Sequence, residues 1–157
     1  MVWQLPVGWF VAIDVLAWAA IHMAAAWAMT RLDAGRFDPD SWLYRERGFE
    51  GRQGELYERL FAVHRWKKKL PDGAALFRGS FRKKRLVSRD PAYLASFARE
   101  TCRGELTHWL ALAATPLFAL WNPPSAMAGI VGYALLANAP CIVAQRYNRI
   151  RLTRMLE

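Results

Sequence analysis

The stretch that decides the fold is residues 106–144, LTHWLALAATPLFALWNPPSAMAGIVGYALLANAPCIVA, which contains no Asp, Glu, Lys or Arg. A helix needs about 20 apolar residues to cross the hydrocarbon core of a bilayer. Asn122-Pro123-Pro124-Ser125 divides the stretch, because proline removes a backbone donor and disfavours the helical state of the residue before it. The stretch therefore predicts two antiparallel transmembrane helices, a helical hairpin over residues 101–147.

A second apolar stretch, residues 2–30, contains no Lys or Arg and only one acid, Asp14. It is too long for the apolar region of a signal peptide, and no basic residue precedes it. We therefore expect a first transmembrane helix here. The fold class that follows is an all-α integral membrane protein of about three transmembrane helices, in a single membrane domain over residues 1–157.

Charge is concentrated between these stretches. The chain has 157 residues and a net charge of +9, and residues 31–104 hold 18 of its 22 basic and 10 of its 13 acidic residues. This split excludes an ordinary soluble domain, a disordered tail and a disulfide-stapled module. The positive-inside rule places the basic segment 31–100 and the basic tail 148–157 in the cytoplasm. Short amphipathic helices near 55–63 and 91–97 are expected at the interface, with anionic lipid rather than nucleic acid as the partner.

Polar residues flank the predicted hairpin. One set precedes its first helix and another follows its second, and the two ends of an antiparallel hairpin lie at the same depth. We expect these residues to form one pocket on the cytoplasmic side, with a basic patch closing over it. The set comprises Glu100, Arg103, Glu105, His108, Asn138, Gln145, Arg146, Tyr147, Asn148 and Arg149, with Arg65, Trp66 and Lys67 from the patch.

These residue types suit acyl transfer. A histidine oriented by a carboxylate can remove a proton from a hydroxyl, and an Arg or Asn can stabilise the resulting oxyanion. We expect His108 to be the general base, Glu105 to orient it, and Arg146 with Asn138 to polarise the acyl carbonyl. Further basic residues suit an anionic, phosphate-bearing donor.

Simpler interpretations remain open at this point. The Glu105–His108 pair alone is also typical of a structural salt bridge, and a single Glu-x-x-His is at most half of a metal site. We therefore expect no metal and no cofactor. Asp14 and His22 either form a polar pair inside the membrane or serve packing. Two cysteines are too few for a disulfide framework, and we expect both to be buried thiols.

Three blocks of sequence carry a resemblance to a known family. They are Arg65-Trp66-Lys67 with Leu70-x-Asp72-Gly73, then ETxRxELxHW over residues 100–109, then Asn138-x-Pro140 followed by QRYNRxRL over residues 145–152. In order and spacing these blocks resemble the glycosyl-4,4'-diaponeurosporenoate acyltransferases, the small membrane acyltransferases of staphyloxanthin-type carotenoid synthesis. The blocks cover residues 65 to 152, more than half of the chain.

The resemblance implies transfer of a fatty acyl group from acyl-CoA or an acyl carrier to a hydroxyl of a glycosylated carotenoid or related glycolipid, at a bacterial cell membrane. Arg103 and Arg149 would then hold the phosphates or thioester carrier of the donor. Two alternatives use the same residues differently. The first is a membrane-embedded peptidase or lipase, weakened by the lack of a GxSxG motif. The second is a lipid-binding membrane subunit without enzymatic activity.

Overall fold

The computed structural model describes residues 6–51, 54–70 and 86–157. Asp72 and Gly73 of the sequence blocks lie outside these ranges. The regular elements of the described residues are helices, which confirms the all-α prediction. The chain forms two compact units: residues 1–32 with 106–139 make unit 1, and residues 33–105 with 140–157 make unit 2.

The first helix of unit 1 is α1, Val7–Thr30. Its 24 residues span about 36 Å at 1.5 Å per residue, enough to cross a bilayer. Pro6 stands at its N-cap, and at the other end the Arg31 N–H donates to the Ala28 carbonyl and the Leu32 N–H to the Met29 carbonyl. Apolar side chains surround the helix and few of them are buried. This result agrees with the helix expected over residues 2–30.

The second long helix is α4, Pro91–Ala113. Asp90 caps it by accepting a hydrogen bond from the Tyr93 N–H at 3.1 Å, as expected for an acid before a first-turn proline. The sequence predicted a short, separate helix near 91–97, and this was wrong. No residue between Phe97 and Thr107 breaks a helix strongly enough, so the two predicted segments form one element.

Pro116 determines where α4 ends. Proline has no N–H to donate to the carbonyl of Leu112, four residues earlier. The chain tightens there into a 3-10 helix, η7, Thr115–Leu120, and then turns at Asn122 and Pro123. The last helix, α5, runs over Pro124–Arg154, so most of the predicted basic tail is helical.

By length and composition, α1 and α5 are the two helices of the described chain that could cross a membrane. The predicted helix after Thr101 is present, but its charged first half keeps α4 from meeting that criterion. Two apolar helices of this length support membrane association.

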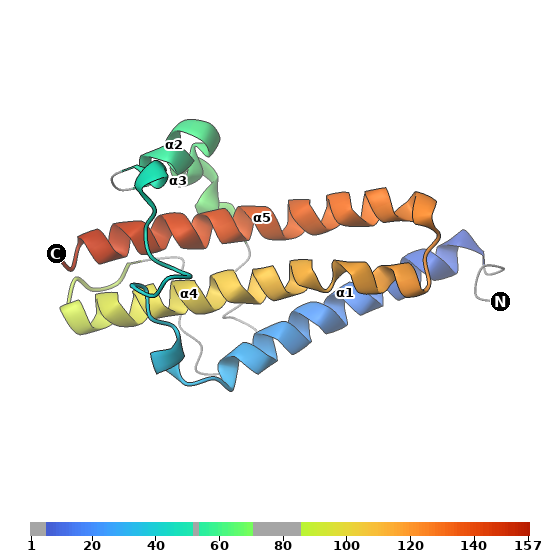
Figure 1. The fold of residues 1–157 in the computed structure, drawn as a ribbon, viewed down its shortest axis with the longest axis horizontal. Coiled ribbons are helices and arrows are strands. Elements are labelled where there is room, and N and C mark those ends of the chain that lie inside the picture. The colour runs from blue at the N-terminus through green and yellow to red at the C-terminus, as the bar shows by residue number, and fades with distance from the viewer. Residues whose placement is uncertain (1–5, 52–53, 71–85) are drawn as a thin grey trace. The chain divides into compact units, whose positions relative to one another are not determined.

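In unit 1, α1 packs on η7 and on the first half of α5 (Figure 1). The core of this unit comprises Trp18, Phe118, Ile130 and Ala134, and the Trp18 and Phe118 rings stack with centroids 4.6 Å apart. Trp9 and Trp27 instead lie exposed on α1, as suits a surface that faces lipid.

Unit 2 carries the short helices of the basic segment. They are η2 (Ala34–Arg36), η3 (Gly48–Glu50), α2 (Glu55–Phe61), α3 (Val63–Trp66) and η5 (Lys67–Lys69). A core of Tyr57, Val63, Tyr147 and Ile150 fixes α2 and α3 against the second half of α5. Gly54 has φ +74°, and a Cβ there would meet the Tyr147 ring at 3.1 Å. The expected helix near 55–63 is therefore present, divided at Ala62 into α2 and α3.

Candidate functional site

Three polar side chains meet inside unit 1, one from each of its long helices. The Nδ1 atom of His108 on α4 lies 2.9 Å from Oδ1 of Asn138 on α5. The Nε2 atom of His22 on α1 lies 3.2 Å from the same oxygen. Asn138 is fully buried. We call His22, His108 and Asn138 the imidazole cluster.

Hydrogen bonding within the imidazole cluster assigns the protons. Asn138 donates from Nδ2 to the carbonyl of Ala134 at 2.9 Å, which turns its Oδ1 toward the histidines. Because this oxygen only accepts, His108 carries its proton on Nδ1, and its Nε2 is the basic atom of the neutral ring. Asn138 is thus a residue that selects the tautomer of His108, and the orienting role expected for Glu105 stays a prediction.

His22 was not among the site residues predicted from the sequence. Its Nδ1 lies 2.9 Å from the Trp18 carbonyl, so both of its nitrogens face oxygen acceptors. The signal that could have found it is the general one, an ionisable residue in the middle of an apolar span.

Asp14 has a separate role from His22. Its Oδ1 accepts from Trp121 Nε1 and from Asn122 Nδ2, both at 2.8 Å. The carboxylate therefore holds the turn between η7 and α5. Of the two interpretations left open by the sequence, hydrogen-bonded packing fits Asp14, while His22 belongs to the imidazole cluster.

Unit 2 contains a buried ion-pair network, which we define as Glu50, Glu105, Arg146 and Arg149. Glu105 accepts from Arg149 Nη2 at 2.5 Å and from Arg146 Nη1 at 3.4 Å. Arg146 also pairs through Nε with Glu50. Arg149 is 1% exposed and donates from Nε to the Tyr44 carbonyl at 3.0 Å. Two carboxylates thus face two guanidinium groups, and the charges of the network balance.

Glu50 is the fully buried acid of this network. Burial alone would raise the pKa of its carboxyl, but hydrogen bonds from Arg146, Tyr57 and the Arg47 N–H lower the pKa below its ordinary value. Burial and the bond to Glu50 conversely raise the pKa of the Tyr57 hydroxyl. Glu50 therefore stays ionised at neutral pH, and Tyr57 stays a donor.

The remaining predicted residues of α4 and α5 lie in unit 2. Arg103 pairs with Glu100 one turn earlier on α4, and its guanidinium lies 4.8 Å from the centre of the Phe37 ring. Gln145 packs on Gly104, where a Cβ would meet its amide carbon at 3.1 Å. Tyr147 is a core residue of the unit. These contacts hold the structure of unit 2 together.

The basic patch is described up to Leu70. Lys67 donates to Asn148 Oδ1 at 2.5 Å, and its ammonium lies 4.7 Å from the centre of the Tyr147 ring. Trp66 donates from Nε1 to the Phe61 carbonyl at 2.7 Å, and Arg65 is exposed. The patch is therefore anchored on residues 147 and 148 of α5, which the sequence also placed in the site.

The predicted residues thus fall into two groups. His108 and Asn138 belong to unit 1, and the others belong to unit 2. The partners described for Glu105 are Arg146 and Arg149, whereas His108 is held by Asn138. The expected single pocket and the pairing of Glu105 with His108 stay predictions. Cys102 and Cys141 are buried thiols, as expected. Within the described ranges, no three His, Cys, Asp or Glu side chains are grouped to hold a metal.

Lys67 provides a prediction about pH. Burial, together with the nearby Arg151 and Lys68 cations, lowers the pKa of its ammonium to about 8, against about 10.4 in an unfolded chain. Between these values the folded protein binds fewer protons than the unfolded chain, so stability rises with pH. We expect denaturation in detergent micelles to show that the wild type gains about 1 kcal/mol relative to Lys67→Met from pH 7 to 9.5, after discounting for solvent screening. The comparison with this variant cancels the opposite contribution of Cys102, because burial raises the pKa of its thiol to about 12 while the thiol of the unfolded chain ionises in this range.

The control for this prediction is a matched pair of variants. Lys67→Met should lack this pH dependence. Lys69→Met, at an exposed position that does not shift the pKa of Lys67, should keep it. Burial and nearby charges raise the pKa of Tyr44 to about 12, so tyrosine ionisation in the unfolded chain reduces stability above pH 10, beyond this window. A rise of equal size in Lys67→Met would contradict the assignment.

Together the fold and the clusters define a class of protein. The chain is a small all-α protein with two helices long enough to cross a membrane, and it buries an imidazole–amide cluster and an ion-pair network. The family model for glycosyl-4,4'-diaponeurosporenoate acyltransferase matches residues 40–157. The chain belongs to this family and is an acyltransferase.

Individual relatives agree with the family. Two proteins named glycosyl-4,4'-diaponeurosporenoate acyltransferase, from different strains of Staphylococcus aureus, are 31% identical to the chain over 140 residues. A third, from another strain, is 30% identical over 141 residues. Each alignment covers 88% of this chain and 83% of the relative. No solved structure matches the chain.

Proposed function

We propose that this protein moves a fatty acyl group from acyl-CoA or an acyl carrier to a hydroxyl of a glycosylated carotenoid or related glycolipid. The observation that carries the proposal is the hydrogen bond between His108 Nδ1 and Asn138 Oδ1. It leaves Nε2 of His108 as a base inside an acyltransferase of this family. The names of the relatives supply the class of acceptor.

The reaction begins at the acceptor hydroxyl. Nε2 of His108 takes the hydroxyl proton while the oxygen attacks the carbonyl carbon of the donor thioester. The tetrahedral oxyanion collapses, the C–S bond breaks, and the imidazolium returns its proton to the leaving thiolate. Histidine therefore serves as base and then as acid, and it ends the cycle neutral.

Other residues position the groups that react. Asn138 holds the tautomer of His108, and the second bond to its oxygen comes from His22. Arg146 pairs with Glu50 and Glu105 in unit 2, and its role in stabilising the oxyanion stays a prediction from the sequence. The phosphates of the donor suit the exposed Arg65 and the neighbouring lysines. The burial of Arg149 and its bond to Glu105 favour a structural role for that residue.

The membrane setting is part of the proposal. Apolar side chains face outward along α1 and α5, so the protein would span a bacterial cell membrane more than once, with lipid acceptors beside it. The positive-inside rule would place the basic segment of unit 2 in the cytoplasm, where acyl-CoA and acyl carriers are made.

A reconstituted assay tests the reaction. The purified protein, in lipid nanodiscs, is given radiolabelled palmitoyl-CoA with or without a glycosyl-carotenoid extract, and lipids are separated by chromatography. We expect a labelled ester only when the acceptor is present. Free fatty acid released without acceptor would support the hydrolase alternative instead. No product, under conditions in which a Staphylococcus aureus relative is active, would overturn the proposal.

A further inference from the structure

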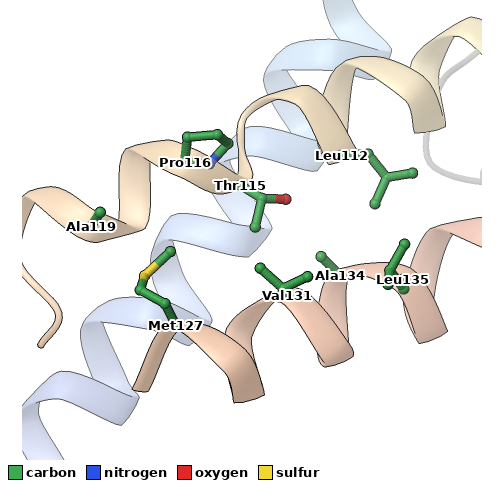
Figure 2. A pocket seen from close by; sticks show the side chains of 8 residues that line it. All are labelled: Leu112, Thr115, Pro116, Ala119, Met127, Val131, Ala134 and Leu135. Carbon is green, nitrogen blue, oxygen red and sulfur yellow. The ribbon is translucent and has the colours of Figure 1, made fainter. Parts of the chain in front are cut away.

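Unit 1 contains a groove with two walls. The end of α4 and η7 form one wall, and α5 forms the other. Figure 2 shows side chains from both segments directed toward the shared space, among them Leu112 and Thr115 above and Val131 and Ala134 below. The groove has a volume of about 480 Å³ and is lined almost wholly by carbon. This volume falls within the range of roughly 300–1,000 Å³ that is typical of small-molecule sites.

Sequence explains why a groove forms here. Pro116 interrupts α4, so η7 does not continue the helical surface that would pack against α5. Ala119 and Ala134 line the groove with methyl groups where longer side chains would fill it. The hollow thus follows from a helix break and two small residues.

One end of the groove lies beside the imidazole cluster. Leu112 follows His108 by four residues on α4, and Ala134 precedes Asn138 by four on α5, so each lies one turn from a cluster residue on the same helix face. The Asn138 amide is bonded directly to the Ala134 carbonyl. The groove therefore leads away from the base, toward Ala119 and Met127.

The lining and the position of the groove indicate its occupant. From Met127 to Ala134 it extends about 10 Å along α5 at 1.5 Å per residue. Its walls are apolar over that length apart from Thr115, and one end lies one turn from His108. A hydrocarbon chain attached to the carbonyl that reacts at His108 matches both properties.

Thr115 adds an independent observation. Thr115 is 7% exposed and lines the groove, and its buried hydroxyl has no hydrogen-bond partner among the described residues. A buried hydroxyl without a partner costs free energy. An unpaired hydroxyl of this kind is more typical of a ligand-binding site than of a packed hydrophobic core.

We propose that this groove holds the hydrocarbon chain of the acyl donor, with the carbonyl end at His108 and the methyl end toward Met127. This inference rests on the proposed function, because the carbonyl that reacts must lie at the base. The chain attached to that carbonyl then leads into the groove. The length of the groove therefore limits the length of acyl chain that the protein can transfer.

The test places a bulky residue halfway along the groove. Val131 lies seven residues, about 10 Å, beyond Asn138, so Val131→Trp leaves room for an octanoyl chain and blocks a palmitoyl chain. We expect kcat/KM for palmitoyl-CoA to fall about tenfold to a hundredfold, because the blocked chain displaces the carbonyl from the base. Octanoyl-CoA should react as with the wild type. The control is Leu136→Trp, an exposed position on the same helix outside the groove.

A second measurement separates this inference from the proposed function. A palmitoyl probe with a photoreactive diazirine at its methyl end is irradiated with the wild-type protein, and the labelled residues are found by mass spectrometry. Labelling near Ala119 and Met127 without any acyl transfer would support the groove while rejecting the function. The groove would be overturned by a different result. In that case the wild type transfers palmitate normally, Val131→Trp and Leu136→Trp have equal kcat/KM for palmitoyl-CoA, and the label is spread over α1.

Discussion

Replacing His108 with alanine should lower kcat for acyl transfer by roughly three orders of magnitude, within the usual 10²–10⁴-fold contribution of a general base. The hydroxyl of a sugar is a weak nucleophile unless its proton is removed as it attacks. In the structure that task falls to Nε2, since Nδ1 is committed to Asn138. The measurement is a single-turnover assay with labelled acyl-CoA and saturating acceptor.

His64→Ala is the matched control, because the exposed His64 in unit 2 pairs with Glu58 and has no place in the proposed chemistry. It should leave kcat within a factor of two or so of the wild type, as a surface substitution does. Asn138→Asp tests the positioning role. The carboxylate of an aspartate at this position still accepts a hydrogen bond from Nδ1 of His108. We expect the substitution to change the pH of half-maximal rate more than it changes KM. Equal rates for the wild type and His108→Ala would remove the base from the mechanism.

The sequence predicted the helical architecture because that architecture depends on local features. An uncharged stretch, a proline-containing turn and a basic segment are visible without tertiary contacts, and α1 and α5 follow from them, whereas the break at η7 was not predicted. The helix boundary that was predicted wrongly depends on whether the residues that follow can end the helix. The segment from Pro91 was predicted to stop where its apolar face ended, yet nothing in the next ten residues ends a helix, so α4 continues to Ala113.

The site was predictable in its residue types and not in its pairings. His108, Asn138, Glu105 and Arg146 all have buried polar contacts, as their positions beside an apolar span suggested. Spacing along α4 favoured Glu105 as the partner of His108, because residues three apart share a helix face. That pairing stays a prediction. The structure adds contacts between helices, because Glu105 also pairs with two arginines of α5 and His108 bonds Asn138. Spacing within one helix could not predict these contacts.

Glu105→Gln should destabilise the protein by about 3–5 kcal/mol, the usual result of removing one partner from a buried ion pair. Arg149 would remain 1% exposed with its charge opposed by a neutral amide. One of its nitrogens, Nη1, already has no hydrogen-bond partner among the described residues. Thermal unfolding in detergent should show a decrease in Tm of roughly 10 °C.

Glu46→Gln makes the same chemical change in a pair that reaches solvent. Glu46 bonds Arg154 at 3.0 Å, but Arg154 is 39% exposed, so water screens the pair and we expect Tm to stay close to that of the wild type. The double variant Glu105→Leu with Arg149→Met removes both buried charges and should recover much of the stability lost by Glu105→Gln, since apolar residues of similar volume replace buried pairs at little cost. Arg146 would keep Glu50 as its counterion. If Glu105→Gln unfolds at the same temperature as Glu46→Gln, the network contributes no stability, and the burial of Arg149 would need another explanation.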